Sequence, residues 1–122
     1  MRIFKEFKFE AAHFLPSAEP GTPNSRIHGH SFRVRVTLEG APADDTGVIQ
    51  HLGIVEDHLK AVQGKLDHRF LNEDVEGLGI PTLEHIALWI WGELEGPLPL
   101  IYEVAVMRDS CGEGCIYRGS QH

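Results

Sequence analysis

The sequence predicts an α+β fold in which a four-stranded antiparallel sheet carries two helices on one face, in the order ββααββ. Three observations lead to this prediction. Apolar and polar residues alternate over two segments near the N-terminus, apolar residues recur at helical spacing over two central segments, and alternation returns near the C-terminus. We expect residues 1–122 to form one domain, because 122 residues with 42% hydrophobic side chains suffice for a single core.

The first two strands are predicted over residues 2–13 and 28–39. One face of the first strand carries apolar side chains and a histidine, at Phe7, Phe9, Ala11 and His13. The second strand places two histidines in phase with its apolar positions, at His28, His30, Phe32, Val34, Val36 and Leu38. The intervening residues 14–26 contain three prolines and a glycine, which predict a loop.

The central segment predicts two amphipathic helices. Apolar residues and His58 recur at helical spacing over residues 54–66. A second helix is expected to begin after Thr82 as N-cap and to end before the Gly96-Pro97 pair. Residues 101–109 and 115–119 then predict two further strands, separated by a glycine-containing turn at residues 111–114. A four-stranded sheet leaves two open edges, and we expect these edges to pair between copies of the chain in a homo-oligomer.

Composition argues against several classes of partner and compartment. Eighteen acidic residues against eleven basic ones give a net charge of −7, which argues against binding to nucleic acid or to an anionic membrane. The N-terminal MRIFKEFKFE lacks the apolar core of a signal peptide, and no apolar run is long enough to cross a membrane. We therefore expect a cytoplasmic protein, in which Cys111 and Cys115 remain thiols.

Three histidines form the main candidate site. If the first two strands form a hairpin, His13 at the end of one lies near His28 and His30 at the start of the other. Residues i and i+2 of a strand point the same way with Cα atoms roughly 6.6 Å apart. Zinc accepts three imidazoles and keeps a fourth position for water or substrate in catalytic sites. The alternative is that the His-Gly-His segment is a polar strand entry and His13 a core histidine with an internal partner.

A second candidate is the LDHRFLN segment, residues 66–72, which follows the first helix. Asp67 beside His68 suggests a base whose imidazole is oriented by a carboxylate. The alternative is a histidine at a helix C-terminus, where the helix dipole favours it. The residues alone leave both readings open.

Five motifs, in this order, carry a family resemblance: FEAAHFL, HGHSFRV, LDHRFLN, PTLEHIALWIW and CGEGCIYRG. Together they span almost the whole chain and resemble the 6-pyruvoyltetrahydropterin synthase family, especially the bacterial 6-carboxytetrahydropterin synthases of queuosine biosynthesis. The resemblance implies the tunnelling fold, in which three subunits form a twelve-stranded barrel, two such trimers stack into a hexamer, and active sites lie between subunits.

The resemblance also implies roles for individual residues. His13, His28 and His30 would bind Zn²⁺, which would coordinate the hydroxylated side chain of 7,8-dihydroneopterin triphosphate as a Lewis acid. Asp67 and His68 match the family's proton-relay pair. Thr82 and Asp109 match residues that hold the pterin, the acidic one through paired hydrogen bonds to its guanidine-like edge.

Several positions depart from the family pattern. Asn24 stands where pyruvoyl- and carboxytetrahydropterin synthases carry a catalytic cysteine, and Ser25 where a related branch carries glutamate. Asp109 replaces a usual glutamate, and His51 replaces an aspartate. A neutral amide accepts no proton at pH 7. The resemblance thus implies a zinc-dependent lyase whose proton transfer falls to Asp67 and His68 or to a zinc-bound hydroxide. One alternative is a diverged family member with another pterin or a purine-like substrate. The other is a non-catalytic, zinc-containing binding or assembly protein.

Overall fold

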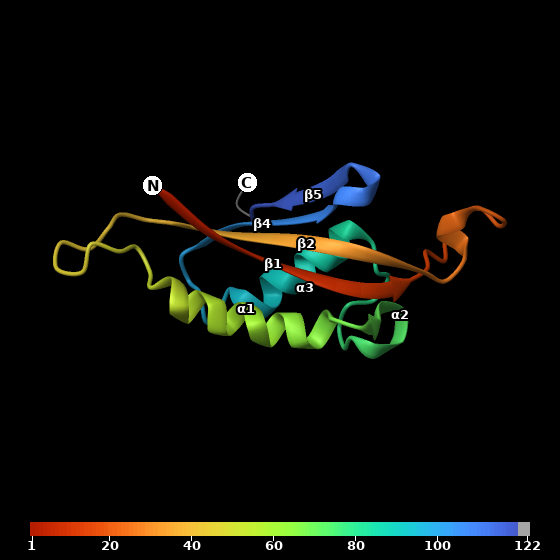
Figure 1. Cartoon of the computed structure of the whole chain (residues 1–122), viewed down its shortest axis with the longest axis horizontal. Coiled ribbons are helices and arrows are strands. Elements are labelled where there is room, and N and C mark those ends of the chain that lie inside the picture. The colour runs from red at the N-terminus through yellow and green to blue at the C-terminus, as the bar shows by residue number, and fades with distance from the viewer. Residues whose placement is uncertain (120–122) are drawn as a thin grey trace.

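The chain folds into one sheet covered by helices on one face, as the computed structural model of residues 1–119 shows (Figure 1). The α+β class is confirmed. The strands and helices are, in chain order, β1 (Arg2–His13), β2 (His28–Glu39), α1 (Leu52–Leu66), β3 (Arg69–Phe70), α2 (Leu71–Asp74), α3 (Leu83–Leu94), β4 (Ile101–Arg108) and β5 (Glu113–Tyr117). Two 3-10 turns, η1 (Pro23–Ser25) and η2 (Asp109–Cys111), complete the list.

The sheet corrects the prediction of four antiparallel strands. Within the described residues it has five strands in the order β3-β1-β2-β4-β5, and β3 pairs in parallel with Ala11 and Ala12 of β1. The short helix α2 follows β3 directly and was not predicted either. A two-residue strand is too short to show an alternating pattern, and its pairing joins segments more than fifty residues apart. Only the tertiary arrangement produces it.

The hairpin of β1 and β2 has the bounds and the pairing that the alternation predicts. The two strands are antiparallel in a continuous register that sets His13 opposite His28 and Ala11 opposite His30. Residues 14–27 form the connecting loop. The neck of this loop is closed by the backbone N–H of Leu15, which donates to the carbonyl oxygen of Asn24 at 2.7 Å. The three histidines therefore lie together at one end of the sheet.

Helices α1 and α3 cover one face of the sheet, α1 beneath β1 and α3 beneath β4 and β5 (Figure 1). The core lies between these layers and includes Phe9, Phe32, Val34, Val36, Leu59, Leu66, Ile86, Ile90 and Val106, all buried. Helix α1 begins at Leu52, two residues earlier than the spacing predicts. Thr82 is the N-cap of α3, since its hydroxyl accepts from the N–H of His85 at 3.1 Å.

Much of the uncovered face of the sheet is charged. Residues of β1 and β2 that alternate with the core positions point to this side, and they form ion pairs such as those of Glu6 with Arg33 and Arg35. The helices in residues 1–119 are too short or too polar to span a membrane.

Candidate metal centre and the adjoining hollow

Three histidine side chains converge where β1 ends and β2 begins. One ring nitrogen of each of His13, His28 and His30 lies within 4.8 Å of the corresponding atoms of the other two. The ring centroids are 4.6 to 5.2 Å apart and the rings meet edge to face. The hairpin register produces this convergence, because His28 faces His13 across the strands and His30 is two residues further along the same face. The set can hold one metal ion.

Hydrogen bonds orient two of these rings. Nδ1 of His13 lies 2.9 Å from the carbonyl oxygen of Pro81, and Nδ1 of His28 lies 2.7 Å from that of Arg26. A carbonyl oxygen only accepts, so both Nδ1 atoms carry the proton and both Nε2 atoms present a lone pair. Both Nε2 atoms are buried, and neither has a hydrogen-bond partner among the described residues. Buried acceptors without a partner are costly in a protein interior. A cation between the rings would satisfy them, and carbonyl-oriented histidines are typical metal ligands.

The surroundings keep His13 and His30 neutral. Burial lowers the pKa of His13 to about 4, despite the opposing effect of the hydrogen bond that its Nδ1 donates to the Pro81 carbonyl. Burial also lowers the pKa of His30. The charge of Arg108 lowers both pKa values further. Neutral imidazole is the form that binds metal. The site is therefore able to bind a metal at neutral pH.

Arg108 is a residue of this site that sequence reasoning missed. It is 8% exposed, and its Nη2 donates to Glu113, its cross-strand neighbour on β5, at 2.8 Å. Its Nε is buried without a partner. Its position in the strand could have indicated its burial, because Val104, Val106 and Arg108 are alternate residues of β4 and therefore point to the same, buried face. A fixed positive charge thus stands within electrostatic reach of His13 and His30.

The metal-free protein is expected to lose stability as the pH falls from about 6.5 to 4. His13 is fully buried with a folded-state pKa of about 4, against about 6.5 in an unfolded chain. Between these values the unfolded state binds more protons, so the free energy of unfolding rises with pH, by at most about 3 kcal/mol from this group. Urea unfolding with a chelator at several pH values measures the slope. His13→Gln should flatten it, and an unchanged slope in that variant would refute the assignment.

Asp67 and His68 form an ordered pair at the C-terminal end of α1. Nδ1 of His68 lies 2.9 Å from Oδ2 of Asp67, while Oδ1 of Asp67 accepts from the backbone N–H of Glu10 at 2.9 Å. Two contacts lower the pKa of Asp67: first the hydrogen bond from the backbone of Glu10, then the hydrogen bond from the His68 ring. The carboxylate therefore holds a proton on Nδ1 of His68 and leaves Nε2 as a lone pair. This is the geometry of an oriented base.

His68 has a left-handed backbone conformation directly after Asp67, the C-cap of α1. Its φ of 59° makes it the one non-glycine residue with positive φ in the described chain. The backbone N–H of His68 donates to the carbonyl oxygen of Glu10, which holds the residue against β1. Helices commonly end on a residue in this conformation, and histidine is among the non-glycine residues enriched there, so the functional interpretation rests on the contact with Asp67.

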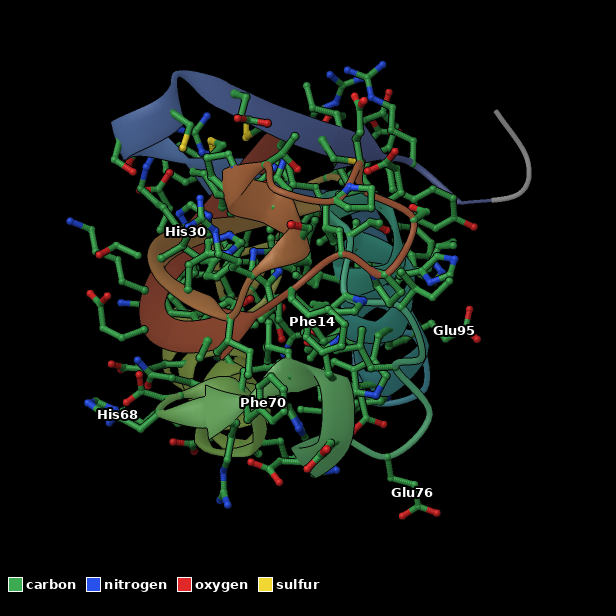
Figure 2. All side chains as sticks on the ribbon, turned by 90° about the vertical axis from the view of Figure 1, so that its right-hand side faces the viewer. Phe14, His30, His68, Phe70, Glu76 and Glu95 are labelled. Carbon is green, nitrogen blue, oxygen red and sulfur yellow. The ribbon has the colours of Figure 1, made fainter. Side chains whose placement is uncertain are left out.

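A hollow of about 710 Å³ connects His30 with His68. Its lining comes from β1, β2, β3 and the last hairpin, and includes Glu10, Gly29, His30, Ser31, His68, Arg69, Phe70, Asp74 and Ser110. Figure 2 shows His30 and His68 on the same side of the molecule. The hollow has room for a small organic molecule that would contact both candidate sites.

Two further contacts fix the parts of this region to one another. The side-chain amide of Asn72 both accepts from the N–H of Phe14 at 2.9 Å and donates to its carbonyl oxygen at 3.0 Å. The rings of Phe14 and Phe70 stack with centroids 6.2 Å apart (Figure 2). The residue that follows His13 is thereby tied to the segment that follows His68.

The remaining candidate residues do not line the hollow. Thr82 is next to Pro81, whose carbonyl orients His13, and its hydroxyl oxygen caps α3. Both carboxylate oxygens of Asp109 accept hydrogen bonds from Arg33. Asn24 is exposed in η1, near the end of β1 because of its backbone contact with Leu15.

Comparisons with known proteins agree with this geometry. Residues 2–120 match the family model described as 6-pyruvoyl tetrahydropterin synthase. A 6-carboxy-5,6,7,8-tetrahydropterin synthase of Synechocystis sp. is 39% identical over 121 residues, covering 94% of this chain and 91% of that protein. The human 6-pyruvoyl tetrahydrobiopterin synthase is 29% identical over 86% of this chain and 74% of its own length. The fold matches that of the Caenorhabditis elegans 6-pyruvoyl tetrahydropterin synthase with a TM-score of 0.85 at 24% identity, over 98% of this chain and 96% of the other.

Proposed function

Because the chain belongs to the 6-pyruvoyl tetrahydropterin synthase family, we propose that it is a zinc-dependent lyase acting on the side chain of 7,8-dihydroneopterin triphosphate. The observation that carries this proposal is the pair of buried Nε2 atoms, on His13 and His28, that have no hydrogen-bond partner within residues 1–119 and belong to the group of three histidines. We also propose that the enzyme is a single cytoplasmic domain over residues 1–122 and that it serves queuosine biosynthesis, since relatives are named 6-carboxytetrahydropterin synthases.

His13, His28 and His30 would hold the zinc ion in this proposal. Three nitrogen ligands suit zinc and leave a position for the substrate. When bound, zinc supplies a Lewis acid that makes protons on the hydroxylated side chain easier to remove. The carbonyl groups of Pro81 and Arg26 keep two of the ligand rings in their metal-binding tautomer.

His68 is the proposed base, and Asp67 is its positioning residue. The Asp67 carboxylate holds the Nδ1 proton, so Nε2 of His68 is free to take a proton from substrate in the hollow. The imidazolium that forms would be stabilised by the adjacent carboxylate. The family's cysteine position is occupied by Asn24, whose amide cannot act as a base, so no second proton acceptor is proposed there.

Thr82 and Asp109 are proposed to bind the pterin ring. The Thr82 oxygen accepts from the N–H of His85, which leaves the hydroxyl proton for a ligand acceptor. Asp109 would accept paired hydrogen bonds from the guanidine-like edge of the ring. Neither residue lines the hollow of its own chain. A substrate bound to them and to the hollow would therefore contact surfaces of two neighbouring subunits.

A homo-oligomer, trimer or hexamer, would bring such surfaces together. β3 pairs with only two residues of β1, so the β1 edge from Arg2 to Glu10 has no strand partner in the described chain, and β5 is the opposite edge. Ile116 on β5 and Phe4 on β1 are exposed apolar residues on these edge strands. Pairing of β5 with β1 of a neighbouring copy would satisfy both edges.

Mass spectrometry of zinc-loaded protein incubated with 7,8-dihydroneopterin triphosphate tests the function. We expect consumption of substrate, and we expect His68→Asn to lower turnover by about a hundredfold or more, as loss of a general base does. His58→Asn, on α1 and outside the hollow, is the matched control and should retain activity. Unchanged substrate after long incubation, with zinc bound, would exclude the proposed reaction.

A further inference from the structure

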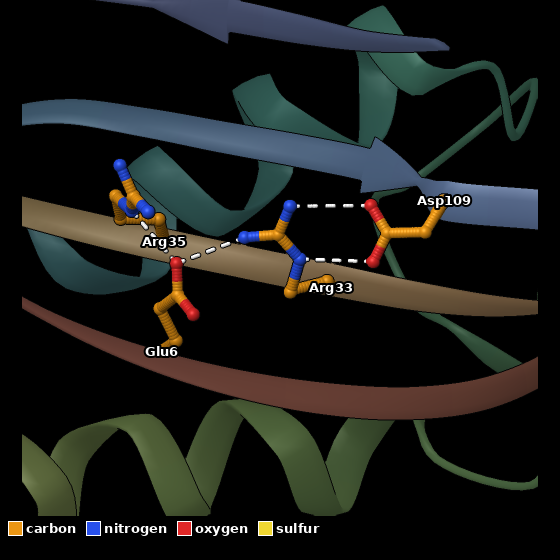
Figure 3. Close-up of polar contacts among 4 residues, drawn as sticks. All are labelled: Glu6, Arg33, Arg35 and Asp109. Carbon is orange, nitrogen blue, oxygen red and sulfur yellow. Dashed lines mark hydrogen bonds and ion pairs between the residues drawn. The ribbon is translucent and has the colours of Figure 1, made fainter. Parts of the chain in front are cut away.

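Four charged side chains form a continuous network on the sheet face opposite the helices (Figure 3). Arg33 of β2 donates from Nε to Oδ2 of Asp109 at 2.9 Å and from Nη2 to Oδ1 at 3.1 Å. Nη1 of Arg33 donates to Oε2 of Glu6 at 3.0 Å, and Nε of Arg35 donates to the same oxygen at 2.7 Å. Arg33 therefore lies between two carboxylates.

Arg33 occupies both oxygens of Asp109. Two parallel N–H groups meeting two carboxylate oxygens form the bidentate arrangement that gives arginine its geometric selectivity. The same donor pattern is presented by any planar ring with an amino group beside a ring N–H. Asp109 is ionised, because the Arg33 contact holds its pKa below the usual range. A ligand with a guanidine-like edge can bind Asp109 in this way only after Arg33 has left.

From this geometry we propose that Arg33 is an internal competitor for Asp109 and so determines which ligands this carboxylate accepts. The proposal rests on the proposed function, in which Asp109 holds the pterin ring. A ligand with paired N–H donors can replace the guanidinium, whereas a ligand that offers a single donor or an acceptor leaves the Arg33 contact in place. Arg33 thereby restricts the site to guanidine-like rings and lowers their apparent affinity.

The network provides a place for the displaced guanidinium. Glu6 already accepts one hydrogen bond from Arg33, so a rotation toward Glu6 keeps the arginine paired while Asp109 becomes free. The Asp109 side chain is 60% exposed, and that of Arg33 is 26% exposed. Ion pairs at such positions contribute little net stability. The competition is therefore weak enough for a ligand held by other contacts to overcome.

Arg33→Met tests this role, because methionine keeps an unbranched apolar stem and removes the donors. Fluorescence titration with neopterin should show binding about threefold to tenfold tighter than for the unsubstituted protein. Arg35→Met is the matched control, since it removes a charge from the same strand and from Glu6 but leaves Asp109 occupied. Its affinity should stay within about twofold. Adding Asp109→Asn to Arg33→Met should remove the gain.

The outcomes separate this inference from the proposed function. Equal or weaker neopterin binding by folded Arg33→Met, with turnover intact, would overturn the competition alone. A gain in neopterin affinity with no conversion of 7,8-dihydroneopterin triphosphate would support the competition and overturn the proposed reaction. Failure of every variant to bind neopterin would overturn both. Circular dichroism of each variant confirms folding, and Arg33→Leu, which also lacks side-chain donors, repeats the measurement if Arg33→Met is unfolded.

Discussion

His30→Ala is expected to weaken zinc binding by more than about a hundredfold and to abolish turnover. Loss of groups that only orient metal ligands costs 10- to 100-fold in affinity, so loss of a ligand should cost more. His30 suits this test because it is only partly buried, whereas backbone carbonyls of Pro81 and Arg26 hold the other two ligand rings. Its removal therefore disturbs the fold less than removal of His13, which is fully buried.

Competition with a chromogenic chelator measures the affinity, and elemental analysis measures the zinc content of the purified protein. His68→Ala is the control, because His68 lies on the hollow but outside the group of three histidines. That variant should keep its zinc and lose its turnover. Stoichiometric zinc of undiminished affinity in His30→Ala would show that the metal is bound elsewhere.

Asn24→Cys is expected to raise turnover of 7,8-dihydroneopterin triphosphate by about a hundredfold, the lower range for general acid–base catalysis. A thiolate accepts a proton where the amide of asparagine does not. Residue 24 lies close to the proposed metal site, because the Asn24 carbonyl accepts a hydrogen bond from the N–H of Leu15, two residues after the ligand His13. That contact belongs to the main chain, so a change of side chain leaves it intact.

Mass spectrometry of products formed by the zinc-loaded variant checks the gain. Asn24→Ser is the control, since a hydroxyl of similar size supplies no base at neutral pH. If both variants bind zinc and neither gains turnover, the pocket has diverged at more than this position. The exposed hairpin around Asp109 would then be the next place to look for a different substrate, beginning with purine-like rings.

The two N-terminal strands show what local patterns reveal. Alternation of apolar and polar residues predicts the bounds of β1 and β2, and the phase of His13, His28 and His30 predicts that they share the core-facing side. Thr82 as the N-cap of α3 is also a local signal, because the cap and the N–H that it accepts are three residues apart. Such features depend on neighbours in the chain, so the sequence carries them directly.

Other features arise from contacts that join distant segments. The carbonyl of Pro81 that orients His13 lies 68 residues away, and Arg33 reaches Asp109 across 76. No periodicity or motif encodes which carbonyl a ring nitrogen will meet, or that a carboxylate expected to bind a ligand is already occupied. The pairing of β3 with β1 belongs to the same group.

The sequence by itself determined the fold class, the bounds of the first two strands, the two long helices and the core-facing phase of the three histidines, because each follows from short-range periodicity. Only the tertiary structure decided the tautomers of two histidines, the hollow shared by His30 and His68, and the bidentate contact between Arg33 and Asp109. The physical reason is that hydrogen-bond partners and cavities depend on how separate elements pack, whereas strands and helices depend on residues a few positions apart.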